Sequence, residues 1–283
     1  MSALDEKKLG RRLQAIRQAA GLTQQTLCQK AGLSYSTLAK IERGAIKTPS
    51  IFTIQNIAIA LGTTLDELVG APALPARQRQ HSRSGVKFVY FDINGCLVQF
   101  SLSVFTKIAA DCDLPSDVVE TAFWHYNDQI SRGEMTMEEF NATMGNRLGM
   151  KDFDWQSYYL GATQAIPQMD QLVTWASQHY GVGILTNSMP GFVKHMMAIG
   201  LIPNIRYDAI VDSSEVHFLK PEREIYEIAL SRSGCEPQEI LFVDDLQGNV
   251  MAGEKLGWHV MKFDVYDAEK SVARIREALE PAN

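Results

Sequence analysis

Asp92 directly follows an apolar run at residues 86–91 (VKFVYF) and precedes Asn94 and Gly95. The run has the length and composition of a buried strand, and the glycine permits a tight turn after it. Open α/β sheets bind their ligands at the carboxyl ends of such strands. The sequence therefore predicts that Asp92 belongs to an active site.

Two further polar clusters also follow apolar runs. Residues 186–188 (Thr-Asn-Ser) come after the run at 182–185, and the acidic pair 244–245 comes after the run at 240–243. Parallel strands end at the same edge of their sheet, so these clusters are expected to meet beside Asp92. Three polar clusters at one sheet edge indicate an active site and not ordinary packing.

The elements that position these clusters alternate between apolar strands and helical patterns from residue 86 onward. This alternation predicts an α/β domain with a mostly parallel sheet. The candidate strands are Val86–Phe91, Val182–Leu185, Ala209–Val211, Ile240–Val243 and His259–Phe263.

Four segments of this region resemble, in order, the four motifs of the haloacid dehalogenase-like (HAD) hydrolases. The resemblance spans residues 86–265, and four motifs at family-like spacing make it specific. It implies a Rossmann-like domain over residues 86–283, with a helical cap inserted at roughly 101–166. The matching segments are 92–97 (DINGCL), 184–188 (ILTNS), 218–226 (FLKPEREIY) and 241–245 (LFVDD).

The resemblance also implies roles for the residues of the catalytic step. Asp92 would be the nucleophile that takes a phosphoryl group. Thr186, with Asn187 beside it, would hold a phosphoryl oxygen, and Lys220 would neutralise the nucleophile and the transferred group. The position of Asn94 is that of the family's general acid/base.

A magnesium ion is the cofactor that the same resemblance implies. Asp245 would bind the ion directly, with Asp244 close by. Asp92 and the backbone carbonyl of Asn94 would complete the protein's ligands. Carboxylate and carbonyl oxygens are the ligands that Mg²⁺ takes in proteins.

Asn94 departs from the family pattern, because the family has a second aspartate there. An amide cannot deliver a proton, and losing a general acid/base typically costs about 10²–10⁴ in rate. The domain could be an impaired phosphatase used as a ligand sensor or for dimerisation. It could also be a slow phosphatase for activated esters, or a dehalogenase, although the pair 244–245 argues against dehalogenase chemistry. Deamidation of the labile Asn94-Gly95 pair would restore an aspartate.

The charge of the chain is divided unequally. Residues 1–85 hold 12 Lys and Arg against 5 Asp and Glu, a charge of +7. The whole chain has 27 against 33, which leaves 15 against 28 after residue 85, a charge of −13. A basic segment joined to an acidic body indicates two domains with different partners. The partner expected for the basic segment is a polyanion.

The basic segment has the pattern of five short helices. Apolar spacing, caps and glycines predict helices at Leu9–Ala20, Gln24–Ala31, Tyr35–Arg43 and Ile51–Leu61, and a fifth begins with the capping pair Thr64 and Glu67. Two short helices joined by a glycine-containing turn form a helix-turn-helix.

Residues 21–44 (GLTQQTLCQKAGLSYSTLAKIERG) resemble the lambda-repressor/Cro (XRE) family, and the resemblance covers roughly residues 7–70. It implies that Gln24 contacts a DNA phosphate and that the helix capped by Ser34 faces the major groove. The residues that would face the groove are Tyr35, Ser36, Thr37 and Lys40.

Three regions are thus expected: an all-α DNA-binding domain at residues 1–70, a basic flexible linker at 71–85, and the α/β domain at 86–283. The combination predicts a transcriptional regulator that binds a palindromic double-stranded operator as a homodimer and responds to a small anionic or phosphorylated ligand. The alternative is an active Mg²⁺-dependent hydrolase that carries a DNA-binding domain. Four scattered cysteines, and the lack of a membrane-spanning apolar run or an export signal, indicate a cytoplasmic protein.

Overall fold

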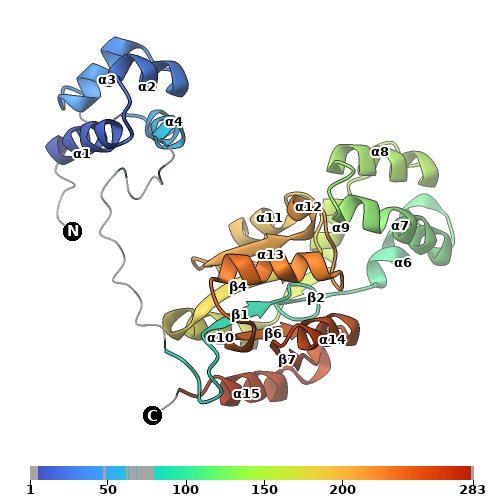
Figure 1. Ribbon diagram of the computed structural model, residues 1–283. Coiled ribbons are helices and arrows are strands. Elements are labelled where there is room, and N and C mark those ends of the chain that lie inside the picture. Colours follow the sequence, from blue (N-terminus) through green and yellow to red (C-terminus); the bar gives the residue numbers. More distant parts are fainter. Residues whose placement is uncertain (1–5, 47–48, 62, 64–67, 69–79, 282–283) are drawn as a thin grey trace. The chain divides into compact units, whose positions relative to one another are not determined.

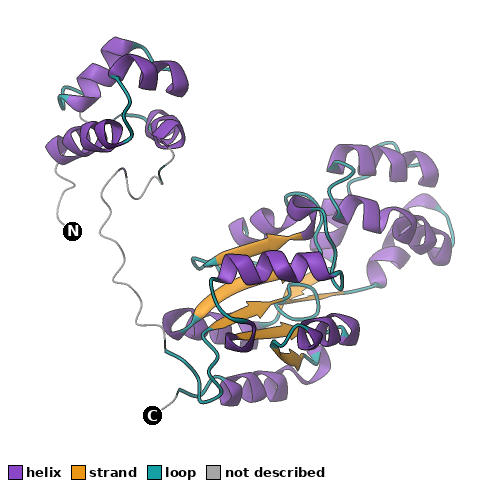
Figure 2. Ribbon diagram, in the orientation of Figure 1, coloured by secondary structure: helices purple, strands orange, loops and turns teal. Residues whose placement is uncertain are grey.

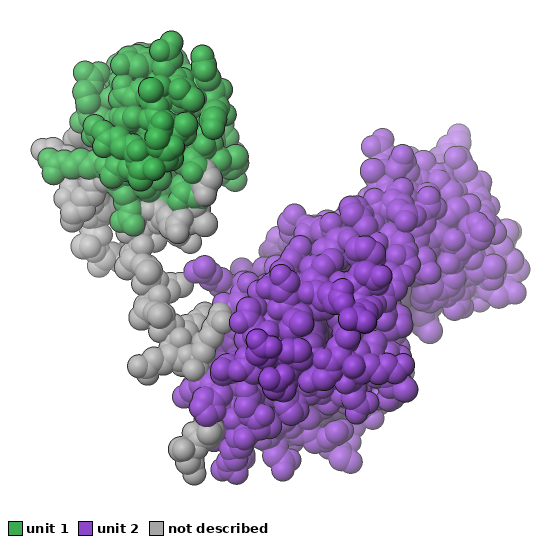
Figure 3. Space-filling view, in the orientation of Figure 1, with its two compact units in different colours: residues 1–77 green, residues 78–283 purple. Residues whose placement is uncertain are grey.

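The computed structural model describes residues 6–46, 49–61, 63, 68 and 80–281. The chain divides into two compact units, residues 1–77 and 78–283 (Figure 3). Each unit is built around its own hydrophobic core. Among the described residues, no helix is long and apolar enough to cross a membrane.

The first unit is helical (Figure 1). Its helices are α1 (Glu6–Ala19), α2 (Gln24–Ala31), α3 (Tyr35–Glu42) and α4 (Ile51–Leu61), which agrees with the predicted pattern to within three residues. The hydroxyls of Thr23 and Ser34 cap α2 and α3, and Gly32 ends α2 in the left-handed region at φ +66°. The predicted capping pair Thr64 and Glu67 lies outside the described residues.

A buried ion pair joins α1 to α3. Arg17 Nε donates to Glu42 Oε1 at 2.7 Å, and Gln24 Nε2 donates to Glu42 Oε2 at 2.6 Å. Arg17 and Glu42 are each 7% exposed. Glu42 therefore fixes α1 and α2 against the C-terminus of α3.

We expect Glu42→Ala to lower the stability of the first unit by about 3 kcal/mol, because it leaves the Arg17 guanidinium buried without its partner. The measurement is hydrogen exchange of the α2 and α3 amides in the full chain. The control is Lys40→Ala, which removes an exposed side chain from the same helix and should change stability by less than about 0.5 kcal/mol. Equal protection in the two variants would contradict the assignment.

The second unit contains a parallel sheet of five strands in the order β5-β4-β1-β6-β7. This confirms the predicted α/β class. The first strand begins at Phe88, two residues later than predicted, because Val86 instead forms a turn with Ser82. The strands are β1 (Phe88–Phe91), β4 (Gly181–Thr186), β5 (Ala209–Asp212), β6 (Ile240–Asp244) and β7 (His259–Lys262).

Helices cover both faces of this sheet (Figure 2). Val89, Phe91 and Val243 face the core shared with α10 (Pro167–His179) and α15 (Ala268–Ala278). Alternate residues such as Tyr90 and Phe242 face α13 (Arg223–Ser233) and α14 (Gln247–Lys255). Strands buried on both sides explain why the sequence runs are apolar throughout and do not alternate.

A helical cap is inserted after β1. It consists of α6 (Ser103–Cys112), α7 (Ser116–Ser131), α8 (Met137–Leu148) and α9 (Trp155–Gly161). The chain enters and leaves it through an antiparallel pair, β2 (Val98–Phe100) and β3 (Thr163–Ala165), which the sequence did not predict. Trp155 is 1% exposed and packs against Phe123, and both belong to the hydrophobic cluster that also contains Val89 of β1.

Short elements and one tether complete the unit. They are α11 (Phe192–Ala198), α12 (Ser213–Val216) and 3₁₀ turns at Pro237–Glu239 and Val265–Asp267. The end of the predicted linker is attached to this unit, because Gln80 N donates to His179 O and Arg83 N to Glu280 O. The earlier part of the predicted linker, residues 71–79, lies outside the described residues.

Candidate active site and nucleic-acid interface

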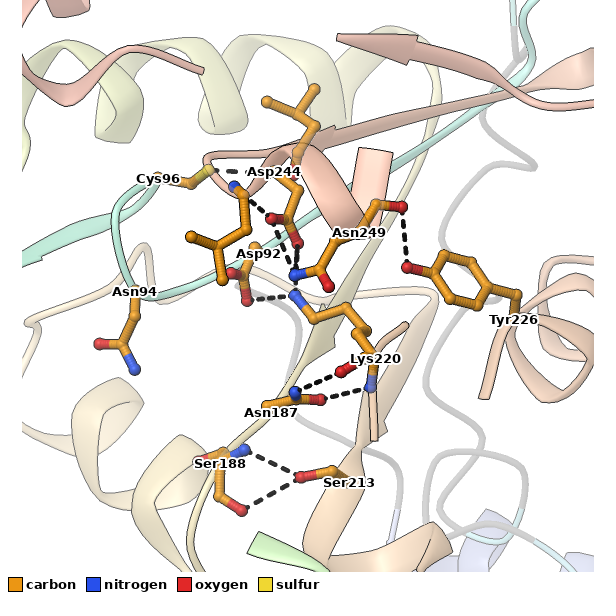
Figure 4. Close-up of polar contacts among 12 residues, drawn as sticks. Asp92, Asn94, Cys96, Asn187, Ser188, Ser213, Lys220, Tyr226, Asp244 and Asn249 are labelled. Atoms are coloured by element: carbon orange, nitrogen blue, oxygen red, sulfur yellow. Dashed lines mark hydrogen bonds and ion pairs between the residues drawn. The ribbon is translucent and has the colours of Figure 1, made fainter. Parts of the chain in front are cut away.

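The carboxyl ends of three neighbouring strands bring the predicted polar clusters together. Asp92 follows β1, Thr186 ends β4 and Asp244 ends β6. The backbone N–H of Asp92 donates to Val243 O at 3.0 Å, which holds the start of the loop after β1 against β6. This arrangement places Asp92 and Asp244 at the centre of the site (Figure 4).

Lys220 joins these two carboxylates. Its Nζ lies 2.8 Å from Asp92 Oδ1 and 2.6 Å from Asp244 Oδ2, and the residue is 4% exposed. Burial acts to lower the pKa of Lys220, but the charges of Asp92 and Asp244 outweigh it and raise this pKa. A protonated lysine is therefore fixed between the two acids.

Asn187 holds the backbone of Lys220 in place. Its Nδ2 donates to Lys220 O at 3.0 Å, and its Oδ1 accepts from Lys220 N at 2.8 Å. This reciprocal pair links the segment after β4 to the segment between α12 and α13 (Figure 4). The structure thus brings Asn187, one of the predicted catalytic candidates, into contact with the backbone of Lys220.

Asp92 has an unusual environment for a carboxylate. Burial raises the pKa of Asp92 to about 7, Lys220 opposes the rise, and Asp244 adds to it. Asp245 shows the same direction, since burial and the charge of Asp244 raise its pKa. The site holds more carboxylates than the single Lys220 amine can neutralise.

Oxygen atoms of Asp92, Asp244 and Asp245 all lie within 4.8 Å of one another. Asp244 is oriented by Leu246 N at 2.8 Å and by Asn249 Nδ2 at 3.0 Å from each carboxylate oxygen. An excess of negative charge on fixed oxygen donors is the donor set that suits Mg²⁺. These three residues therefore fit the predicted ion.

Gly95 allows Asp245 to approach the loop after β1. Its φ is +78°, in the left-handed region, and an added Cβ would stand 2.3 Å from Asp245 Oδ2. A side chain at this position would push Asp245 away from the other two carboxylates. The glycine of the first motif therefore has a steric role in the acidic cluster.

Asn94 lies to one side of the charged cluster (Figure 4). Its Oδ1 accepts a hydrogen bond from the hydroxyl of Tyr159, a residue of cap helix α9, at 2.5 Å. Tyr159 also packs against Phe100 and Phe192 and is 6% exposed. The sequence did not predict this contact.

Thr186 retains an available hydroxyl. Its Oγ1 is buried and has no hydrogen-bond partner among the described residues. A buried hydroxyl without a partner is costly, and a ligand oxygen would satisfy it. Ser188, by contrast, is held by Ser213, whose Oγ accepts from Ser188 N at 3.0 Å.

The predicted DNA-contacting residues lie on or beside two helices of the first unit. Tyr35, Ser36 and Lys40 are exposed on α3, with Tyr35 at 59% exposure. Ser34 Oγ caps α3 by accepting from Thr37 N at 3.2 Å, so this hydroxyl is already engaged. Gln24 begins α2, but its amide is bound to Glu42.

Each of the two units matches a known protein family. Residues 86–257 match the family model of haloacid dehalogenase-like hydrolases, which is more than half of the chain. The chain belongs to the haloacid dehalogenase-like hydrolase family. Residues 13–68 match a helix-turn-helix family, and the first unit is a helix-turn-helix of the XRE type.

The relatives of each unit differ. The chain is 44% identical over 66 residues to the immunity repressor of Bacillus phage phi105, covering 23% of this chain and 45% of that protein. It is 23% identical over 192 residues to a D-ribitol-5-phosphate phosphatase of Bacteroides thetaiotaomicron, covering 62% and 91%. It covers only 18% of mouse acyl-CoA dehydrogenase family member 10, with 26% identity over 188 residues.

A solved structure agrees with the fold of the second unit. The HAD family enzyme bt-2542 of Bacteroides thetaiotaomicron, crystallised with magnesium and inorganic phosphate, has a TM-score of 0.52 at 20% identity. The match covers 64% of this chain and 96% of that enzyme. At this identity, the similarity establishes the fold.

Proposed function

We propose that this protein is a sequence-specific DNA-binding transcriptional regulator whose HAD-like domain is an impaired phosphatase, used as a ligand sensor, a dimerisation module or both. The observation that carries the proposal is Asn94. Its amide stands at the acid/base position, and its Oδ1 is already bound by Tyr159. With Mg²⁺ held by its clustered carboxylates, the site formed around Asp92 and Lys220 would suit an anionic or phosphorylated ligand.

The impairment follows from what each residue can do. Asp92 is placed to attack phosphorus, and Lys220 and Thr186 are placed to neutralise and hold the phosphoryl oxygens. When bound by Asp92, Asp244 and Asp245, Mg²⁺ supplies charge neutralisation at the transferred group. Asn94 has no acidic proton to give to a leaving oxygen and cannot accept one from water. Binding is retained while turnover is slowed.

We expect Mg²⁺ to raise the thermal stability of the native chain and to have little effect on Asp245→Asn. Binding to the folded state alone adds about 2.7 kcal/mol at one hundred times the dissociation constant, and Asp245 supplies one of the three clustered carboxylates. The measurement is the shift in melting temperature of the second unit on titration with MgCl₂ and on its removal with EDTA. Glu254→Gln, an exposed change on α14, is the control and should keep the native shift.

The first unit is proposed to bind a palindromic operator as a homodimer, since one such unit reads a short half-site. The α3 residues, above all half-buried Thr37 and exposed Lys40, supply hydroxyl and ammonium donors for DNA. A ligand of the second unit regulates this binding only if the DNA-competent and incompetent states bind it unequally. A gel-shift midpoint unchanged by every ligand that binds the Asp92 site would contradict the sensor role.

Two substitutions on α3 should separate readout from charge. We expect Thr37→Val to cost about 1 kcal/mol of binding to the specific operator, because one hydrogen bond to a base is lost. We expect Lys40→Ala to weaken binding to all sequences and to lower the salt slope by about one. Fluorescence anisotropy at several salt concentrations checks both. Identical sequence discrimination in Thr37→Val and the native chain would exclude Thr37 from base readout.

An active hydrolase with a DNA-binding domain is the second candidate. The intact contacts of Asp92, Lys220 and Asp244 favour it, because they are the contacts that a nucleophile requires. The two candidates differ in the rate of phosphomonoester hydrolysis by the native chain.

A further inference from the structure

We propose that Asp92 is a phosphorylation site that takes its phosphoryl group from acyl phosphates and retains it. The inference rests on the proposed function, because it requires a competent nucleophile beside an impaired acid/base position. The second unit then acts as a phosphate-marked switch, and acyl phosphates are the class of donor that it detects.

The side chains around Asp92 are of the kinds that receive a phosphoryl group. Lys220 Nζ lies 2.8 Å from the Asp92 carboxylate and supplies a fixed positive charge. Thr186 supplies a buried hydroxyl with no partner among the described residues, at the end of the strand next to Asp92. Asp244 and its neighbour Asp245 complete a cluster whose excess negative charge suits Mg²⁺. Attack on phosphorus is therefore supported by charge and by geometry.

The leaving group decides which donors can react. An alkyl or sugar phosphate needs a proton on its departing oxygen, and Asn94 has none to give. Tyr159 directs its hydroxyl proton to Asn94 Oδ1, and burial raises the pKa of this phenol. Phe192 packs against the Tyr159 ring, and Met196 Sδ lies 4.0 Å from its hydroxyl, so apolar groups adjoin this position.

Acyl phosphates avoid this requirement. One Asp92 oxygen forms a bond to phosphorus as the bond between phosphorus and the acyl oxygen breaks, and the electron pair of that bond leaves with the carboxylate. A carboxylic acid has a pKa of about 4, so the departing group needs no proton at neutral pH. The products are an aspartyl phosphate and a free carboxylate, and no proton is transferred.

The lack of an acid/base group at position 94 also makes the aspartyl phosphate persistent. Hydrolysis of the aspartyl phosphate requires water to lose a proton as it attacks, and the Asn94 amide cannot accept one. Asp92 is 6% exposed, and the Tyr159–Asn94 hydrogen bond joins cap helix α9 to the loop after β1. We expect the mark to last about 10²–10⁴ times longer than in Asn94→Asp, which is the usual contribution of a general base.

The phosphoryl group on Asp92 changes the charge beside Lys220, whose segment is hydrogen-bonded to the cap. A phosphoryl group brings about two negative charges and competes with Asp244 for Lys220. The segment that carries Lys220 also carries Glu222, which accepts from Leu219 N at 3.0 Å and from Arg132 Nη1 of the cap at 2.9 Å. These bonds connect the Lys220 segment to the cap, so we expect a shift of Lys220 toward the phosphoryl group to alter the Glu222–Arg132 contact.

The test is incubation of the full chain with acetyl phosphate and Mg²⁺, followed by intact-mass and peptide-mass measurements. We expect the native chain to gain one phosphoryl group on the peptide containing Asp92 and to lose it in hydroxylamine, which cleaves acyl phosphates but not phosphate esters. Asp92→Asn should stay unmodified. Asp212→Asn, the same change at the end of β5, should be modified like the native chain.

The outcomes separate this inference from the proposed function. Modification that survives in Asp92→Asn, or no modification of the native chain while Asn94→Asp hydrolyses acetyl phosphate, overturns the inference and leaves the impaired-phosphatase proposal standing. Continuous hydrolysis of acetyl phosphate by the native chain at the rate of Asn94→Asp overturns both. A mark that is stable in the native chain and short-lived in Asn94→Asp supports both.

Discussion

Asn94→Asp is expected to raise Mg²⁺-dependent hydrolysis of an alkyl phosphomonoester by about 10²–10⁴-fold over the native chain. The substitution restores a group that can protonate the leaving oxygen and later deprotonate water. Tyr159 would still donate to one oxygen of the new carboxylate, as it now donates to Asn94 Oδ1, and the second oxygen would exchange the proton. Glycerol phosphate is a suitable substrate, since its leaving alkoxide depends strongly on protonation.

The leaving group provides the internal control. With p-nitrophenyl phosphate, whose phenolate leaves more easily, the gain from Asn94→Asp should be smaller than with glycerol phosphate. The double variant Asp92→Asn/Asn94→Asp should be inactive with both substrates, because the nucleophile is absent. If the native chain hydrolyses glycerol phosphate as quickly as Asn94→Asp, the acid/base position is not limiting and the protein is an active hydrolase.

The strands of the α/β unit were predictable because their burial on both faces leaves a direct trace in the sequence. Continuous apolar runs mark β1, β4 and β6, and polar residues follow where each strand ends. Parallel pairing then brings those ends to one edge, so the proximity of Asp92 and Asp244 follows from topology. The contact of Lys220 with both carboxylates could not be predicted from the spacing of residues within any one segment.

The hairpin β2–β3 was not predictable, because its strands are three residues long and largely exposed. Such short segments carry too few residues for a period to appear. They pair only because the cap between them returns the chain to its starting point. The hairpin is therefore a consequence of the cap, which the sequence indicated only through family resemblance.

The contact between Tyr159 and Asn94 was missed for a related reason. Tyr159 lies in an aromatic run that reads as ordinary core, and its ring does pack there against Phe192. Its hydroxyl, however, meets a residue 65 positions away in the chain. Gln24 shows the same limit, since its amide binds Glu42 across 18 positions. Polar tips of buried or capping residues take partners that only the tertiary fold selects.

Lys220→Met is expected to lower the stability of the α/β unit by about 5 kcal/mol at pH 8 in the presence of EDTA. The substitution keeps the apolar stem but leaves Asp92 and Asp244 buried without their shared cation, and breaking such a pair costs about 3–5 kcal/mol. The measurement is urea denaturation of the native and variant chains. Lys194→Met, at an exposed ion pair with Glu215, should change stability by less than about 1 kcal/mol.

The loss should depend on pH in one direction. The folded-state pKa of Asp92 is about 7, above the ordinary 3.8, and removing Lys220 raises it further. A carboxyl whose pKa is raised by folding binds more protons in the folded state, so its contribution is intact below about pH 4 and is lost as pH rises through the folded value. Both chains lose stability in parallel up to about pH 7, and only Lys220→Met continues to lose it above that value, so the difference between the two should widen as pH rises through 7. A difference that is constant from pH 5 to pH 8 would mean that the Asp92 charge is not what Lys220 compensates.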